Sequence, residues 1–198
     1  MELLFATNNL NKVKEIRAAL PEKFQIKTLA EAGIEEDIPE PYDTIEENAI
    51  AKSSYIKEHY GLDCFSEDTG LEVDALNGEP GVRSARYAQR ENYPDNIAKL
   101  LEKLDGKSNR NARFKTVISL QSGNDKILFE GICNGRITFE RSGTEGFGYD
   151  PVFVPEGSNI TFAEMTLDEK NQYSHRKKAL QKLLAHLNNH GKDQTTDS

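Results

Sequence analysis

Short apolar runs alternate with stretches of helical apolar spacing, and this pattern predicts a succession of strands and helices. The continuous apolar run over residues 3–6 is typical of a strand buried on both faces, and apolar positions at helical spacing follow it up to Pro21. A second strand is predicted over residues 24–29, an acidic loop over 31–43, and an amphipathic helix after the capping-box sequence at Thr44. This order favours parallel strands in the first half.

The second half has longer strand-like runs. Residues 71–76 form one such run, and residues 114–120 and 127–133 flank a Gly-Asn-Asp turn, which predicts an antiparallel hairpin. A further strand is predicted over residues 136–140, and apolar stripes indicate a helix before Gly106 and another near the end of the chain. We therefore expect an α/β fold in which a parallel first half meets an antiparallel second half.

Composition limits the number of domains and the kinds of partner. The chain has 198 residues, 36% of them apolar, and no long Gly/Ser/Pro linker, which suits one compact domain. We expect this domain to span residues 1–190 and the polar residues 191–198 to form a disordered tail. The formal net charge of −8 argues against general affinity for nucleic acid, which needs a basic surface.

Cysteine usage and hydropathy bear on the compartment. Cys64 and Cys133 lie in apolar surroundings and are too few for a disulfide framework, so we expect reduced thiols in the core. No apolar run approaches the roughly 18 residues of a membrane-spanning helix, and the N-terminus lacks the basic-then-apolar form of a signal peptide. These observations predict a cytoplasmic protein that does not span a membrane.

Two adjacent acids stand out in the middle of the chain. Glu67 and Asp68 follow a short apolar run and precede a Thr-Gly pair, so we expect them at a junction between a strand and a turn, where acids can face a ligand. Arg83 and Arg86 follow after a turn and can bind an anion. The segment suggests a metal and a phosphate, but it equally suits a loop of solvated acids and structural arginines.

The loop after the first predicted strand has the groups of a phosphate site. Its sequence, Thr7-Asn8-Asn9-Leu10-Asn11-Lys12, offers hydroxyl, amide and backbone N–H groups at a helix N-terminus, followed by an ammonium group. The alternative is that the asparagines serve only as turn and cap residues and the lysine is solvated.

Glu47 has two possible roles in the helix that begins after Thr44. It is placed to complete the capping box, which is a purely structural role. A carboxylate in the first turn of a helix can also share a divalent ion with another acid across a cleft. Lys52, about one turn further on, would approach the same opening.

Two later segments offer contacts for a flat ligand. Three glycines around Phe147 let the backbone approach such a ligand while the ring stacks on it, although the same sequence suits the end of a hairpin. His175 and Arg176, beside a helix start, can donate hydrogen bonds to a ligand carbonyl; the alternative is a capping serine with two solvated neighbours.

Four segments together resemble a known family. They are TNNLNK (7–12), EDTGLEVDALNGEPGVRSARY (67–87), GTEGFGYDPVF (143–153) and SHR (174–176). In this order they closely resemble the inosine triphosphate pyrophosphatase (Ham1-like) family, from about residue 3 to about residue 188. The resemblance implies a mixed, elongated sheet flanked by helices, with two lobes around a central cleft. It also implies a homodimer that uses Mg²⁺ to cleave the purine nucleotides ITP, dITP and XTP to the monophosphate and pyrophosphate.

The resemblance assigns roles to individual residues. It implies that Asp68 and Lys12 are catalytic, with Asp68 as proton acceptor, and that Glu47 and Asp68 bind the metal. The residues that it places on the substrate are Thr7, Asn8, Asn9, Leu10, Asn11 and Lys12 at the triphosphate, Thr69 beside them, and Phe147, Gly148, Tyr149, Asp150, Lys170, His175 and Arg176 at the base.

The sequence departs from the commonest family pattern at several positions. Asn8 and Asn11 replace frequent glycines, and Glu67 begins a Glu-Asp-Thr sequence where Asp-Asp-Ser is common. Glu145 replaces another usual glycine, and an acid near the base pocket can alter which purine is preferred. The polarity of these segments is otherwise kept.

The chemistry can be assessed without the family. Hydrolysis of a phosphoanhydride requires neutralisation of phosphate charge and an oriented water, which Lys12 and Mg²⁺ on two carboxylates can supply. An Asp at its reference pKa of about 3.9 is a weak base, so we expect Asp68 to act mainly as metal ligand and water-orienting group. Donors from His175 and Arg176 would favour a 6-keto base, since an unpaired buried donor facing adenine costs about 1–3 kcal/mol.

Two rival functions remain open from the sequence. A Maf-type nucleotide pyrophosphatase would share this kind of fold but prefer pyrimidine or guanine nucleotides. A nucleotide-binding regulator or RNA-binding module that has lost catalysis is the other alternative. The joint presence of Lys12, Glu47 and Asp68 argues against lost catalysis, and the net charge of −8 argues against RNA.

Overall fold

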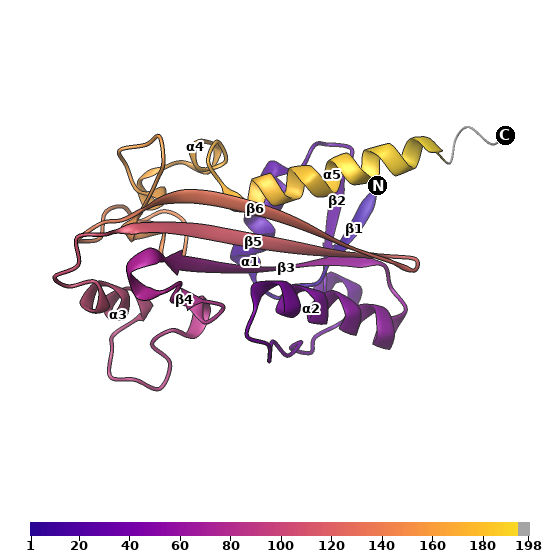
Figure 1. Ribbon diagram of the computed structural model, residues 1–198. Helices are drawn as coiled ribbons and strands as arrows, with labels where there is room; N and C mark the ends of the chain where they lie inside the picture. Colours follow the sequence, from indigo (N-terminus) through magenta and orange to yellow (C-terminus); the bar gives the residue numbers. More distant parts are fainter. Residues whose placement is uncertain (194–198) are drawn as a thin grey trace.

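Three long strands run through the whole molecule and carry the rest of the fold (Figure 1). A computed structural model describes residues 1–193 of the chain. The strands form one sheet of order β2-β1-β3-β5-β6-β7, with β4 paired to β3. They are β1 (Glu2–Phe5), β2 (Gln25–Thr28), β3 (Cys64–Val73), β4 (Pro80–Gly81), β5 (Asn111–Ser122), β6 (Asp125–Ile137) and β7 (Phe153–Pro155). The helices are α1 (Leu10–Ala19), α2 (Ile45–Tyr60), α3 (Asn96–Lys103), α4 (Leu167–Lys170) and α5 (His175–Asp193).

The sheet is parallel at one end and antiparallel elsewhere, which confirms the predicted meeting of two halves. β1 pairs in parallel with β2 and β3, and every other ladder is antiparallel. Two strands are longer than predicted. β3 continues without a break through Thr69 and Gly70, and β6 continues where separate strands were expected over 127–133 and 136–140.

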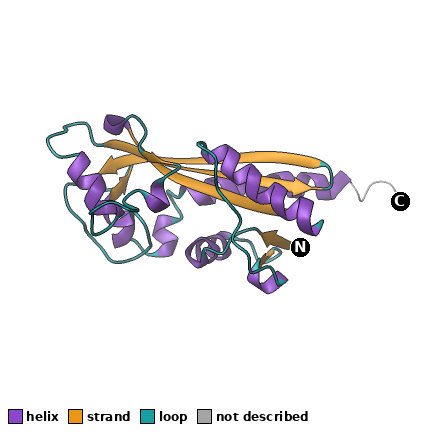
Figure 2. Ribbon diagram, turned by 90° about the horizontal axis from the view of Figure 1, so that it is seen from below, coloured by secondary structure: helices purple, strands orange, loops and turns teal. Residues whose placement is uncertain are grey.

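Two apolar cores lie at opposite ends of the long strands, and they give the protein its two lobes. One core gathers residues around α1, β1, β2 and α5, and the other gathers residues around α3, β7 and the segment that precedes α4. The turned view shows the long strands running between the two groups (Figure 2). Each long strand contributes to both cores, through Phe65 and Leu71 on β3, Ile118 and Phe114 on β5, and Phe129 and Cys133 on β6.

α2 and α5 cover opposite faces of the sheet (Figure 1). On the α2 face, the hydroxyls of Ser53 and Ser119 are hydrogen-bonded at 2.8 Å. On the α5 face, Leu180 and Leu183 of the helix pack with Ile118 of β5. Each helix therefore contacts every second residue of the same strands, because successive side chains of a strand point to opposite faces of the sheet.

Other sequence predictions can be compared with the described residues. Cys64 and Cys133 are free and buried, and burial raises the pKa of these thiols to about 12 and about 11. No helix among residues 1–193 is long and apolar enough to cross a membrane. Of the predicted tail 191–198, residues up to Asp193 belong to α5, and residues 194–198 lie outside the described part.

The outer edge of β6 is covered by side chains of α5. The ammonium group of Lys178 donates to the carbonyl oxygen of Ile132 at 2.8 Å, and that of Lys182 donates to the carbonyl oxygen of Glu130 at 2.6 Å. β7 pairs with β6 only from Gly135 to Ile137, so these carbonyls lie where β6 has no outer strand.

We expect Gly131→Ala to disrupt the packing of α5 against β6. A Cβ at Gly131 would lie 2.0 Å from the carbonyl oxygen of His175 and 2.6 Å from the nitrogen of Ala179, which are both backbone atoms. The free energy of unfolding should fall by at least about 3 kcal/mol in denaturant titrations, because neither atom can move alone. Gly106→Ala is the control, since its Cβ meets open space at a positive φ, and it should cost about 1 kcal/mol. Equal costs for the two variants would contradict the packing argument.

Candidate active site

One edge of β3 has no partner strand over five residues, and the main cavity lies there. β1 reaches β3 only at Phe65, and β4 pairs with it only at Leu71 and Glu72, so residues 66–70 are paired only with β5. A cavity of about 460 Å³ lies against this edge, and Asp68 is part of its wall. All four segments that carry the family resemblance contribute to the lining.

The two adjacent acids of β3 point to opposite faces of the sheet. Glu67 contacts Arg176 of α5, whereas Asp68 faces Lys52 of α2, because successive residues of a strand alternate. Both acids are buried. The expected junction between strand and turn is therefore wrong: the acids lie inside a continuous strand, and the alternation gives them separate roles.

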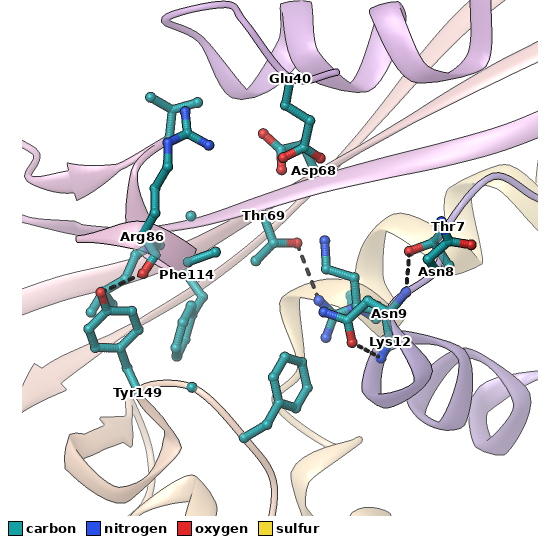
Figure 3. Close-up of a pocket in the computed structure, with 18 of the residues that line it drawn as sticks. Thr7, Asn8, Asn9, Lys12, Glu40, Asp68, Thr69, Arg86, Phe114 and Tyr149 are labelled. Carbon is teal, nitrogen blue, oxygen red and sulfur yellow. Dashed lines mark hydrogen bonds between the residues drawn. The ribbon is translucent and has the colours of Figure 1, made fainter. Parts of the chain in front are cut away.

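The phosphate-type loop forms the N-terminus of α1. Oδ1 of Asn9 accepts from the backbone nitrogens of Asn11 (3.0 Å) and Lys12 (3.2 Å), and Oγ1 of Thr7 accepts from the nitrogen of Asn9 (3.1 Å; Figure 3). Asn9 is thus the helix cap, as one reading of the sequence allowed. The members of the loop that line the cavity are Thr7, Asn8, Asn9 and Lys12. Leu10 is 77% exposed, and neither it nor Asn11 lines the cavity.

A chain of buried ion pairs connects the loop before α1 to the opposite end of the cavity. Nζ of Lys12 lies 2.9 Å from Oε1 of Glu67, and Nε of Arg176 donates to Oε2 of Glu67 at 2.7 Å. Arg176 also donates to Glu15, which accepts from Nζ of Lys170 at 2.5 Å. The chain ends where Lys170 donates to Oδ2 of Asp150 at 2.6 Å.

Glu15 is the member of this chain that sequence reasoning missed. It lies one turn after Lys12 on α1, so the two side chains share a helix face. This spacing was visible in the sequence, but its partners lie more than 150 residues further on. Burial alone would raise the pKa of Glu15 and of Glu67, but the adjacent cations outweigh burial and lower both pKa values. Both carboxyls are therefore ionised at neutral pH.

Arg176 is largely occupied by the protein itself. Besides its bonds to Glu67 and Glu15, its Nη2 donates to Oγ1 of Thr69 at 3.3 Å. A guanidinium group has five N–H donors, and these contacts leave one of them for a ligand. The main role of Arg176 is thus to hold α5 against β3 and α1, although it also lines the cavity.

His175 is a buried neutral imidazole at the same end. It stacks on Phe114 with ring centroids 4.6 Å apart, and its Nδ1 is buried without a hydrogen-bond partner. Burial and the nearby cations of Arg176 and Lys170 hold the pKa of His175 well below its ordinary value. An unpaired polar atom in the cavity wall is a group that a ligand can satisfy.

The predicted base-bordering segment, residues 147–150, closes this end of the cavity. The hydroxyl of Tyr149 donates to the carbonyl oxygen of Ser84 at 2.7 Å, and Oδ2 of Asp150 accepts from the nitrogen of Phe147 at 3.0 Å. These bonds fix the segment and leave the Phe147 ring half-buried at the cavity. Glu145 is exposed and does not line the cavity. The structure thus shows no contact through which this acid would alter which purine is preferred.

Glu40, not Glu47, is the second acid beside Asp68. Glu47 is exposed, accepts from the hydroxyl of Thr44 at 2.7 Å, and lines a separate groove. The structure thus does not bring Glu47 and Asp68, the predicted metal pair, together in the cavity: the Glu47 carboxylate bonds to the hydroxyl of the cap residue Thr44 and does not line the cavity. Glu40 lines the cavity near Asp68 (Figure 3). The sequence placed it in an acidic loop, where nothing marked it among its neighbours.

The environment of Asp68 suits a cation. Nζ of Lys52 donates to Glu40 and lies 3.9 Å from Oδ1 of Asp68, so an ammonium group is shared by the two acids. Oδ2 of Asp68 is buried without a partner. No cluster of three or more metal-ligating side chains occurs within residues 1–193. Two carboxylates are nevertheless a sufficient protein contribution for Mg²⁺, which keeps waters and binds substrate phosphates.

Asp68 is a stronger base than its reference pKa suggested. Burial raises the pKa of Asp68 to about 6, against the lowering effect of Lys52 and Lys12, and Glu40 adds to the rise. A carboxylate with a pKa nearer neutrality accepts a proton more readily than one at about 3.9. The raised pKa thus favours a larger role as base than the sequence suggested, where Asp68 was expected to act mainly as metal ligand and water-orienting group.

Arg86 adds a free cation to the cavity wall. It lies in the 3-10 turn Ser84–Arg86, which the amide of Asn96 holds by hydrogen bonds to two of its carbonyl oxygens. Among the residues that the structure describes, its guanidinium group has no hydrogen-bond or ion-pair partner. Arg83 is exposed and does not line the cavity, so only one of the two predicted anion-binding arginines is in place.

Comparison with known proteins agrees with this arrangement. The sequence profile of the Ham1 family matches residues 3–186. A dITP/XTP pyrophosphatase of Flavobacterium psychrophilum is 53% identical over 96% of this chain and 100% of its own, and one of Flavobacterium johnsoniae is 54% identical over 93% of this chain and 96% of its own. The solved structure of the Staphylococcus aureus Ham1 protein has a TM-score of 0.84 at 36% identity, covering 96% of this chain and 100% of that one.

We expect Glu67→Gln to destabilise the fold strongly. The substitution leaves the buried cations of Arg176 and Lys12 without their shared carboxylate, and breaking a buried pair in this way costs about 3–5 kcal/mol. Glu72→Gln is the matched control on the same strand, because its pair with Arg113 is solvent-exposed and should cost less than about 1 kcal/mol. Chemical denaturation of both variants measures the difference. A cost for Glu67→Gln no larger than that for Glu72→Gln would show that the buried chain contributes little.

Proposed function

The chain belongs to the Ham1 family, and from this premise we propose that it hydrolyses ITP, dITP and XTP to the nucleoside monophosphate and pyrophosphate. Such an enzyme removes non-standard purine nucleotides from the nucleotide pool. One observation carries the proposal: a single cavity has the capped loop of α1 at one end and the Phe147–Asp150 segment at the other, with Asp68 between them (Figure 3). The names of the relatives, dITP/XTP pyrophosphatase, support two of these substrates.

The triphosphate binds at the α1 end in this proposal. Backbone N–H groups at the helix start and the ammonium group of Lys12 attract the phosphate oxygens. Arg86 and Lys52 add two more cations to the same wall. When the triphosphate enters, Lys12 exchanges part of its interaction with Glu67 for a phosphate, because Glu67 keeps Arg176 as its partner.

Asp68 acts on the attacking water. Its buried Oδ2 has no protein partner and is free to accept a hydrogen bond from that water and then its proton. We propose that Glu40 and Asp68 also hold Mg²⁺, which when bound supplies charge neutralisation on the phosphates and a more acidic water. Glu47 has no part in this site.

The base binds between Phe147 and the buried groups of α5. Lys170 uses two of its three N–H donors on Glu15 and Asp150, and Arg176 has one N–H left. Together with the unpaired Nδ1 of His175 in the tautomer that carries its proton there, these donors favour a carbonyl at position 6 of the purine over an amino group. Lining residues offer no evident contact to the 2′-hydroxyl, so ribo- and deoxyribonucleotides are both substrates. A homodimer and a cytoplasmic location are also part of the proposal, and they rest on the family resemblance and composition.

A substrate panel tests the proposed activity. We expect Mg²⁺-dependent release of pyrophosphate from ITP, dITP and XTP, with kcat/KM for ATP lower by about 10- to 100-fold or more, because a buried donor would face the 6-amino group. GTP and dTTP complete the panel, and EDTA treatment should abolish release. A preference for dTTP or GTP would favour a Maf-like activity instead. No turnover of any nucleotide would favour a binding protein.

Matched substitutions test the assignment of the acids. Glu40→Gln should lower kcat/KM for ITP by about 100-fold or more at limiting Mg²⁺, because it removes one of the two carboxylates at the proposed metal site. Glu47→Gln should retain activity within about twofold and lose only cap stability, about 1 kcal/mol. Asp68→Asn should fold normally and lose activity. Wild-type turnover by Asp68→Asn, or a larger loss in Glu47→Gln than in Glu40→Gln, would refute this assignment.

A further inference from the structure

The segment that carries Glu40 crosses α2 as a strap fastened at both ends; we use the word strap for residues 36–42. At its start, the carboxylate of Glu36 accepts from the hydroxyl of Tyr55 at 2.8 Å and from that of Tyr60. At its end, the amide of Asn48 makes two bonds to the backbone of Tyr42: Oδ1 accepts from its nitrogen and Nδ2 donates to its carbonyl oxygen, both at 3.0 Å. Both of these fastenings belong to α2, and Nδ2 of Asn8 adds a bond to the carbonyl oxygen of Glu36 at 3.4 Å and one to Oδ1 of Asp37 at 3.3 Å.

Between these ends the backbone of the strap has little other support. No backbone–backbone hydrogen bond involves residues 36–42 in the described structure. A groove of about 470 Å³ lies between the strap and α2, and Ile38 lines both this groove and the main cavity. The strap is therefore a wall one segment thick, with Glu40 on its cavity side and Pro39 and Pro41 on its groove side.

The sequence of the strap makes its fastenings decisive for Glu40. Pro39 and Pro41 lack backbone donors; Pro39 fixes its own φ, and Pro41 keeps Glu40, the residue before it, out of the helical region. The local conformation is thus preset, and what remains to be fixed is where the strap lies relative to β3. Lys52 contacts the Glu40 carboxylate directly, but it is itself a cation that a metal would compete with. The fastenings at Glu36 and Asn48 involve no cationic side chain, so a metal ion does not compete with them directly.

We propose that Tyr55, Tyr60 and Asn48 are positioning residues that hold Glu40 opposite Asp68 and thereby set the affinity for the divalent cation. None of the three touches the main cavity. Their effect passes through the strap to a single carboxylate. This inference rests on the proposed function, since it assumes that Glu40 and Asp68 share the cation.

The test removes the two hydroxyls and keeps both rings. In the full chain with Tyr55→Phe and Tyr60→Phe together, Mn²⁺ binding measured by electron paramagnetic resonance should weaken by about tenfold, as for other groups that orient metal ligands. The Mg²⁺ concentration for half-maximal activity should rise by the same factor, while KM for ITP at saturating Mg²⁺ and the melting temperature stay unchanged. Tyr93→Phe is the matched control, because it removes a hydroxyl bound to Glu102, outside the cavity wall, and it should leave Mn²⁺ binding unchanged.

A second variant and a reference separate the possible outcomes. Asn48→Asp keeps the acceptor for Tyr42 and loses the donor, so it should weaken Mn²⁺ binding in the same direction. Asp68→Asn reports whether the cation site exists. If wild type binds Mn²⁺ and Asp68→Asn does not, but the double tyrosine variant binds as wild type, the strap inference is wrong and the proposed function stands. If wild type binds no Mn²⁺, both fail together. Equal weakening in Tyr93→Phe would also overturn the inference.

Discussion

The unpaired edge of β3 is the constraint on which the rest of the site depends. β1 stops at the level of Phe65 and β4 starts at Leu71, and the gap between them gives a ligand access to the middle of a strand that is otherwise buried. Within this gap the alternation of side chains separates two neighbouring acids. Glu67 forms an ion pair with Arg176 of α5, whereas Oδ2 of Asp68 has no hydrogen-bond partner. One strand thus supplies a carboxylate bound in ion pairs and one with an unpaired oxygen at successive positions.

The buried ion pairs fix the distance between the two ends of the cavity. Arg176 on α5 binds Glu67 on β3 and Glu15 on α1, so one guanidinium group joins α1, which begins at one end of the cavity, to α5, which begins at the other. Burying charges is expensive, and well-packed apolar residues often stabilise a core as well. The main effect of these ion pairs is to fix relative positions. Lys12 contacts Glu67, and Glu67 contacts Arg176, the neighbour of His175, so Lys12 and His175 are held in a fixed spatial relation.

Much of the fold could be predicted from local patterns, because helix caps and apolar periodicity are local. The roles of the individual acids were harder to predict from the sequence. Thr69 and Gly70 resemble a turn in sequence, but Gly70 serves instead to admit the backbone of Gly81, which would lie 2.5 Å from a Cβ there. Glu47 fits two roles equally well in the sequence, and in the structure its carboxylate bonds to the hydroxyl of Thr44 outside the cavity. Glu15 and Glu40 bind partners that are distant in the sequence, and the periodicity of apolar residues gives no information on such contacts. The family resemblance named residues at both ends of the cavity, whereas the position of Glu40 beside Asp68 became evident only in the structure.

The lysines on the edge of β6 have a consequence for the protein in a crowded solution. A strand whose outer carbonyls are free offers a template on which a second chain can add a strand, and this is a common start of aggregation. Lys178 and Lys182 fill two successive outward carbonyls of β6 with ammonium groups. An approaching strand would have to displace both cations and place its own N–H groups beside them. The two lysines thus oppose the addition of a foreign strand to the outer edge of the β5–β6 hairpin.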